Sequence, residues 1–172
     1  MSDQLSIVFV CTGNICRSPY AERRAASLSR IHRFASAGTR AVVGSPMDAF
    51  MAAEARERGA DPRGFSSKQV SWDLLDAADL ILTAESGQRS WLLSDWPRLR
   101  SRLLTVGHFA SMLPEAPSGL DPRAVIQQVV GRREQVSAAL DVPDPYLKGR
   151  EAAHACADLL DELLGKIFLH LG

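Results

Sequence analysis

Residues 8–19 constrain the fold of this chain more than any other segment, because they join a strand to a helix through a loop of fixed length. The β-branched and aromatic run VFV is typical of a buried strand and leads directly into Cys11. Five residues separate Cys11 from Arg17, and Ser18 and Pro19 then open a helical pattern. Ordered loops of this kind lie at the carboxyl ends of parallel strands, where ligands bind.

Apolar strand-like runs alternate with helical patterns along the rest of the chain. This alternation predicts a three-layer α/β fold in which a four-stranded parallel sheet has helices on both faces. We expect strands over residues 5–10, 34–37, 80–83 and 103–106. We expect helices over residues 18–33, 46–58, 72–77, 85–93, 123–140 and 151–169.

Glycine and proline predict where these elements are interrupted. Residues 107–122 are rich in both and predict a loop, and two close prolines make residues 142–146 a stiff loop. Gly131 weakens the expected helix over residues 123–140, so two shorter pieces are the alternative.

Length, charge and cysteine content narrow the class of protein. A chain of 172 residues suits one domain, and 20 basic residues balance 20 acidic ones, so nothing favours nucleic-acid binding. No apolar stretch approaches the roughly 20 residues that span a bilayer, and the first residues lack the positive region of a signal peptide. Three cysteines suit reduced thiols. We therefore expect a cytoplasmic protein without membrane insertion.

The loop between Cys11 and Arg17 predicts an anion site that contains a nucleophile. Its length lets backbone N–H groups point inward, and the following helix adds the positive end of its dipole. This field, together with the Arg17 guanidinium, should favour the thiolate form of Cys11. Gly13 and Asn14 tolerate left-handed backbone in a tight loop, and Ser18 is able to hydrogen-bond the sulfur.

The loop sequence CTGNICRSP closely resembles the active-site loop of the low-molecular-weight protein tyrosine phosphatases. Further segments match that family in order and approximate spacing, so the resemblance extends over almost the whole chain. They are Ser36-Ala37-Gly38-Thr39, Gly44-Ser45-Pro46-Met47-Asp48, Ala78-Asp79-Leu80-Ile81-Leu82-Thr83 and Asp144-Pro145-Tyr146. The resemblance implies one phosphatase domain over residues 1–172, with the phosphatase loop after the first strand.

The resemblance also implies a role for each matching residue. Cys11 is the nucleophile, Arg17 binds the phosphate, and Asp144 is the general acid. The other expected phosphate- and substrate-binding residues are Thr12, Gly13, Asn14, Ile15, Cys16, Ser18 and Tyr146. The general-acid role of Asp144 also follows from the chemistry, since a phenolate leaving group needs a proton and this acid lies on a rigid, proline-containing loop.

The implied partner is a protein that carries phosphotyrosine, and a bacterial tyrosine kinase is a candidate. Neither a metal nor a cofactor is implied, and the sequence leaves the oligomeric state open.

Several positions depart from the commoner pattern of the family. Leu147 occupies the position where a second aromatic residue often follows Asp-Pro-Tyr, and Val42 replaces a frequent aromatic residue on the opposite wall of the substrate cleft. Tyr146 is therefore the main aromatic side chain expected to line the cleft. Phe65 replaces a His that often supports the loop Asn, so the resemblance does not supply that hydrogen bond to Asn14. The segment at residues 123–140 is longer than usual.

Other interpretations remain open at this stage. Cys16 is either a disulfide partner that protects an oxidised Cys11 or a small packed side chain. Arsenate reduction on the same scaffold would need resolving cysteines, which the chain lacks between Cys16 and Cys156. A phosphoprotein-binding module without activity is the third hypothesis, but Cys11, Arg17 and Asp144 are all present.

Overall fold

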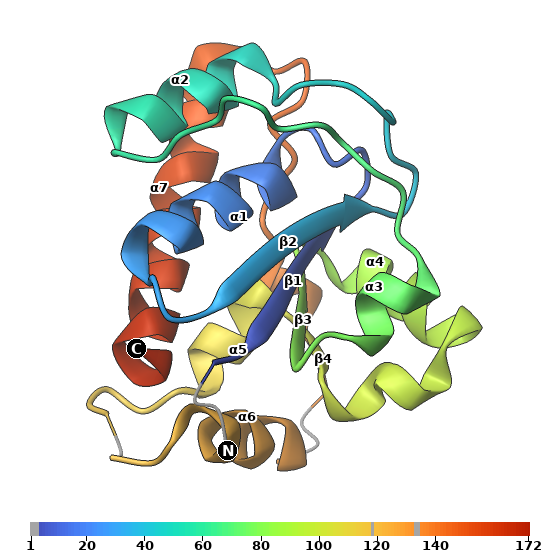
Figure 1. Ribbon diagram of the computed structural model, residues 1–172, viewed down its shortest axis with the longest axis vertical. Coiled ribbons are helices and arrows are strands. Elements are labelled where there is room, and N and C mark those ends of the chain that lie inside the picture. Colours follow the sequence, from blue (N-terminus) through green and yellow to red (C-terminus); the bar gives the residue numbers. More distant parts are fainter. Residues whose placement is uncertain (1–3, 118, 133–134) are drawn as a thin grey trace.

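The computed structural model describes residues 4–117, 119–132 and 135–172, and its centre is a parallel sheet (Figure 1). The strand order is β2-β1-β3-β4. The strands are β1 (Ser6–Cys11), β2 (Arg33–Gly38), β3 (Leu80–Thr83) and β4 (Leu103–Thr105). The expected four-stranded parallel sheet with helices on both faces is confirmed, and the carboxyl end of its central strand β1 falls at Cys11.

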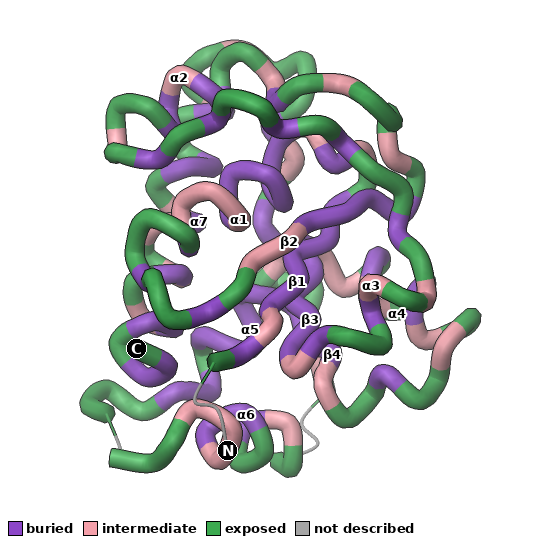
Figure 2. Tube along the Cα trace, in the orientation of Figure 1, coloured by how far each residue is buried: buried purple, intermediate pink, exposed green. Residues whose placement is uncertain are grey.

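Alternate residues of β1 enter two hydrophobic cores, one on each face of the sheet. Ile7 and Phe9 belong to the larger core, whereas Val8 and Val10 belong to the smaller one. Figure 2 shows β1 and β3 largely buried between these layers. The larger core is formed with α1 (Arg17–Leu28), α2 (Ala49–Glu57), α5 (Val106–Met112), α6 (Pro122–Gly131) and α7 (Gly149–Leu171). The smaller core is formed with α3 (Trp72–Asp76), α4 (Ser86–Asp95) and the 3₁₀-helix η1 (Pro97–Ser101).

Helix α1 ends at Leu28, so the helix expected over residues 18–33 is too long. The chain has to turn back before β2, which begins at Arg33 beside Ser6 of β1. His32 fixes this turn: its Nδ1 accepts the N–H of Leu5 at 3.2 Å, and its Nε2 lies 2.9 Å from the carbonyl oxygen of Leu171. The buried imidazole thus joins the turn to β1 and to the end of α7.

The loop expected over residues 107–122 is wrong at its start, where the structure has α5. Thr105 caps this helix by accepting the N–H of His108 at 3.1 Å, and Phe109 and Ala110 place an apolar face in the core. Gly107, which suggested a break, is needed for packing, because a Cβ there would overlap the carbonyl oxygen of Leu140.

The helix expected over residues 123–140 is not continuous, and the alternative of shorter pieces is closer to the structure. Asp121 caps α6 by accepting the N–H of Ala124 at 3.1 Å, and the helix ends at Gly131. Residues 133–134 lie outside the described part of the chain. A short 3₁₀-helix, η2 (Ala138–Leu140), then leads into the stretch that contains Asp144.

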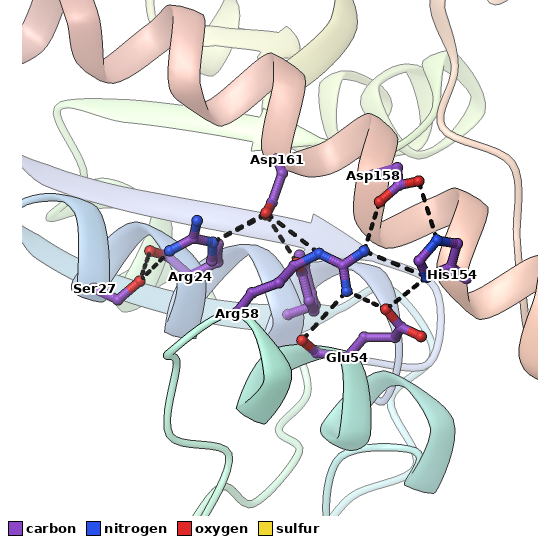
Figure 3. Close-up of polar contacts among 8 residues, drawn as sticks. Arg24, Ser27, Glu54, Arg58, His154, Asp158 and Asp161 are labelled. Atoms are coloured by element: carbon purple, nitrogen blue, oxygen red, sulfur yellow. Dashed lines mark hydrogen bonds and ion pairs between the residues drawn. The ribbon is translucent and has the colours of Figure 1, made fainter.

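Charged side chains connect the three helices α1, α2 and α7 in the outer layer (Figure 3). Arg58, just after α2, pairs with Glu54 of α2 and lies 3.5 Å from Asp161 on α7. Asp161 also accepts from Arg24 of α1 at 3.1 Å, and His154 of α7 lies 3.1 Å from Glu54. The helices that cover the larger core are therefore joined by partly buried ion pairs as well as by apolar contacts. Within the described ranges, no helix has both the length and the apolar composition to span a membrane.

Candidate active site

The loop between β1 and α1 brings a thiol and a hydroxyl into contact. The Sγ atom of Cys11, at the last position of β1, lies 3.0 Å from Oγ of Ser18 in the first turn of α1. Both residues are 2% exposed. A hydroxyl at this distance is placed to donate a hydrogen bond to a thiolate.

Asn14 holds the loop through both ends of its amide. It has a φ of 54°, so the expected left-handed backbone is present here, whereas Gly13 has no positive φ. The Nδ2 group of Asn14 donates to Oγ of Ser18 and to Oγ of Ser36, each at 2.9 Å. Its Oδ1 accepts the N–H of Lys68 at 2.9 Å. Phe65 replaces the His that often hydrogen-bonds this Asn in the family. Here Asn14 is held instead by Ser36 on β2 and by the backbone N–H of Lys68.

The backbone at the end of β2 packs closely against the loop. A Cβ at Gly38 would overlap the carbonyl oxygen of Thr12 and lie 3.0 Å from the N–H nitrogen of Asn14, so the position requires glycine. The side chain of Thr12 accepts a hydrogen bond from Nε2 of Gln88 on α4 at 3.1 Å. Sequence reasoning missed Gln88 because the contact depends on how α4 packs.

Arg17 connects the loop to two other parts of the chain. Its side chain is 3% exposed, pairs with Glu85 at the start of α4, and donates through Nη1 to the carbonyl oxygen of Val142 at 2.8 Å. Burial alone would lower the pKa of Arg17, but the hydrogen bond to Glu85 and the charges of Cys11 and Asp144 raise it. Arg17 is therefore held as a permanent cation. Glu85 was not predicted, since its sequence context resembles an ordinary helix start.

The Nε atom of Arg17 is buried and has no hydrogen-bond partner among the residues that the structure describes. Both Nη atoms face acceptors or carboxylates, whereas this donor remains for an additional oxygen.

The structure brings Asp144 to the same site. Its Oδ2 lies 3.5 Å from Nη2 of Arg17, and its Oδ1 accepts the N–H of Tyr146 at 3.2 Å. Two side chains beyond this turn are exposed to solvent: Tyr146 is 47% exposed and Leu147 is 85% exposed, with a φ of 59°. The carboxyl group of Asp144 thus lies beside the buried guanidinium of Arg17. The exposed side chains of Tyr146 and Leu147 follow it in the chain.

Hydrogen bonds to the end of β3 and the start of α4 fix the stretch that carries Asp144. The N–H of Val142 donates to the carbonyl oxygen of Ala84 at 2.9 Å. Asp141 accepts from the N–H of Ser86 at 2.7 Å and from the hydroxyl of Ser86 at 2.9 Å. Asp141 and Ser86 were not predicted, because nothing in either local sequence marks the other as a partner.

Apolar side chains also lie beside the loop near Gly13. The N–H of Val42 donates to the carbonyl oxygen of Gly13 at 2.9 Å, and the Val42 side chain is 50% exposed. Ile15 is partly buried, and its carbonyl oxygen accepts the N–H of Asp48 at 2.8 Å. Val42 therefore lies beside the loop, where a smaller apolar side chain replaces the aromatic residue that is frequent in the family.

All three cysteines are buried free thiols. Burial, followed by the negative charges of Asp48 and Cys11, raises the pKa of Cys16, so this thiol stays protonated at neutral pH. Burial raises the pKa of Cys156 to about 12. The disulfide role of Cys16 stays a prediction. Within the described residues, no group of three or more His, Cys, Asp or Glu side chains is placed to hold a metal ion.

Comparison with known proteins identifies the family. The family model described as "Low molecular weight phosphotyrosine protein phosphatase" matches residues 6–128. The chain belongs to this family of phosphatases. The matched residues contain Cys11 and Arg17, whereas Asp144 lies beyond them.

Individual relatives extend the similarity over most of the chain. The protein-tyrosine-phosphatase Wzb of Salmonella typhi is 34% identical over 158 residues, which cover 90% of this chain and 86% of Wzb. The crystal structure of the tyrosine phosphatase AmsI from Erwinia amylovora superposes with a TM-score of 0.74 at 27% identity, covering 96% of this chain and 91% of AmsI. The YwlE arginine phosphatase from Geobacillus stearothermophilus also has a TM-score of 0.74, at 25% identity and with coverage of 95% and 90%.

Proposed function

We propose that this protein hydrolyses phosphotyrosine in protein substrates through a covalent cysteinyl-phosphate. One observation carries the proposal: the buried Arg17 begins the helix that follows the Cys11 loop, and its Nη2 lies 3.5 Å from Asp144. This arrangement supports a site in which a nucleophile, an anion-binding group and an acid act together. The two hypotheses left open by the sequence, arsenate reduction and binding without catalysis, have no comparable support in the named relatives.

The phosphoryl group is transferred first to the enzyme. The Cys11 thiolate attacks phosphorus in line with the leaving group, while loop N–H groups and Nε of Arg17 hold the equatorial oxygens. Asp144 gives its proton to the departing phenol oxygen as the P–O bond breaks. The free phenol leaves, and the phosphoryl group stays on sulfur.

Water completes the reaction. Asp144, now a carboxylate, takes a proton from a water molecule that attacks the phosphorus of the cysteinyl-phosphate. The P–S bond breaks and the electron pair returns to Cys11, whose thiolate accepts a hydrogen bond from Ser18. Inorganic phosphate leaves. The remaining predicted residues Thr12, Gly13, Asn14, Ile15 and Cys16 contribute the shape and the N–H groups of the loop.

The rim favours an aromatic substrate over a cationic one. Val42, Ile15 and the ring of Tyr146 offer apolar contact to a phenyl ring, which a phosphorylated guanidinium would not exploit. We take residues 1–172 as one domain, because the larger core contains residues from Leu5 to Leu171. We expect the protein to act in the cytoplasm, and a bacterial tyrosine kinase is a candidate substrate.

A panel of matched phosphopeptides tests the proposal. One peptide is prepared with phosphotyrosine, phosphoserine or phosphoarginine at the same position, and phosphate release is measured with wild-type protein and with Cys11→Ser. We expect rapid release from phosphotyrosine only, and none with the variant. Faster release from phosphoarginine would assign the site to the chemistry of the arginine phosphatase neighbour. Arsenate reduced in the presence of thiols would instead favour the reductase hypothesis.

A further inference from the structure

A second pocket lies away from the catalytic loop, beside the edge strand β4. It has a volume of 640 Å³, and residues of α4, η1, β4, α5 and α6 line it. Figure 1 labels α4, β4, α5 and α6. This volume is in the usual range for sites that bind small molecules. None of the loop residues from Cys11 to Ser18 lines it. The side chains that matter here are Arg89, Arg98, Arg100, Leu104, Met112 and Val129.

The pocket combines positive charge with an apolar wall. Its lining includes three arginines and, among the described residues, neither Asp nor Glu. None of these arginines forms an ion pair with a carboxylate in the described part of the chain. Arg89 is fixed through Nε, which donates to the carbonyl oxygen of Leu103 at 3.0 Å, and Arg98 lies over the ring of Trp72 at 4.9 Å. Arg100 is exposed at the rim.

The arginine cluster is electrostatically unfavourable by itself. Partial burial, and then the charge of Arg100, lower the pKa of Arg89, so two cations lie close together with no compensating carboxylate among the residues that the structure describes. Groups held in such unfavourable electrostatic surroundings are typical of functional sites. An anion between the two guanidinium groups would remove the repulsion.

We propose that this pocket binds a small organic anion. A phosphate, sulfonate or carboxylate group pairs with Arg89 and Arg100, since guanidinium groups bind such oxyanions through two parallel hydrogen bonds. The apolar body of the ligand lies against Leu104, Met112 and Val129. The site is separate from the catalytic loop, and its occupant is neither the phosphorylated residue nor the released phosphate.

Titration with 1-anilinonaphthalene-8-sulfonate tests this site, because the probe joins a sulfonate to an aromatic body. Its fluorescence is followed with wild-type protein, with Arg89→Gln/Arg100→Gln, and with Arg30→Gln/Arg56→Gln. The control variant loses the same charge from two exposed arginines elsewhere. We expect one probe per chain in wild-type and control proteins, and about tenfold or greater loss of affinity in the pocket variant.

Thermal unfolding and catalytic activity show whether the pocket variant has lost only the binding site or has misfolded. The pocket variant loses the Arg89 hydrogen bond to Leu103 as well as the repulsion, so it should still unfold cooperatively within about 5 °C of wild type without the probe. Its kcat/KM for 4-nitrophenyl phosphate should stay within about twofold of wild type. Equal probe affinity in the pocket and control variants would overturn the proposal. So would inorganic sulfate that binds as tightly as the probe, because the apolar wall would then contribute nothing.

Discussion

The hydroxyl of Ser18 and the amide of Asn14 show how single residues prepare the nucleophile. Asn14 donates to Ser18, and Ser18 in turn contacts the sulfur of Cys11. The hydroxyl of Ser18 has two acceptors within reach, the carbonyl oxygen of Ala37 at 3.4 Å and the sulfur of Cys11 at 3.0 Å. Once Cys11 is ionised, its thiolate is the stronger acceptor of the two. The contact between Ser18 and the sulfur joins the end of β1 to the start of α1, which explains why the sequence was sufficient to predict it. The hydrogen bond from Asn14 to Ser18 was not predicted.

The two chemical roles predict different defects at the residue scale. Cys11→Ser should abolish turnover but keep phosphate binding, because the loop N–H groups and Arg17 remain. Asp144→Asn should slow hydrolysis of 4-nitrophenyl phosphate by roughly 10²- to 10⁴-fold, the usual scale for general acid catalysis. Steady-state rates and phosphate titration by calorimetry check both. Full activity in either variant would exclude the mechanism.

The redox prediction concerns Cys16 alone. If this thiol captures an oxidised Cys11, peroxide should inactivate wild-type protein reversibly, and dithiothreitol should restore its activity. Cys16→Ser should instead progress to irreversible oxidation and recover poorly. The measurement is the activity regained after graded peroxide exposure, with Cys156→Ser as the matched control. Equal recovery in Cys16→Ser and wild-type protein would leave Cys16 as a packed side chain.

At the scale of elements, α4 shapes the active site more than its sequence suggested. Its first turn supplies Gln88 to the loop and Ser86 to Asp141, and Glu85 just before it pairs with Arg17. These contacts join residues far apart in the chain, so periodicity and local motifs carry no signal for them. The same reason explains the missed helix α5, whose Gly107 serves a distant contact rather than a turn.

Asp141 is expected to position the proton donor. Asp141→Ala removes both hydrogen bonds to Ser86, so the stretch that contains Asp144 should lose its fixed place. The value of kcat/KM should fall roughly ten- to hundredfold for phenyl phosphate and much less for 2,4-dinitrophenyl phosphate, whose leaving group needs no proton.

A double-variant comparison decides whether Asp141 acts through Asp144. In an Asp144→Asn background, Asp141→Ala should cause little further loss, because the acid it positions is already absent. Asp121→Ala is the matched control, since it removes the cap of α6 and leaves the Asp144 stretch unchanged. An equal loss with both phenyl esters would show that Asp141 acts on folding rather than on proton transfer.

For the whole molecule, the ion pairs among α1, α2 and α7 predict acid sensitivity. Burial would raise the pKa of Glu54, but hydrogen bonds from Arg58 and His154 outweigh it and hold the pKa below its usual value. A carboxylate with a lowered pKa stabilises the fold above its unfolded pKa, and this contribution is lost as the pH falls through the folded pKa.

Urea unfolding measures this contribution. At about pH 7, Glu54→Gln should lower the free energy of unfolding by about 1–3 kcal/mol, because Arg58 loses a charged partner. The difference from wild type should shrink as the pH falls from the usual carboxyl range through the lowered pKa of folded Glu54. Asp61→Asn, in an exposed pair with Arg63, is the control and should change stability little. A difference that persists undiminished in acid would contradict the pKa argument.

The absence of a side chain at Gly38 limits how the catalytic loop can be transplanted. Because the backbone of β2 touches the Thr12 carbonyl, the loop takes part of its curvature from a neighbouring strand. Residues 11–18 grafted alone into another scaffold would carry the reactive groups but would lack the strand end that fixes the loop backbone. The smallest unit that keeps the loop shape also includes the last residues of β2, with Ser36 and Gly38 paired in register with β1.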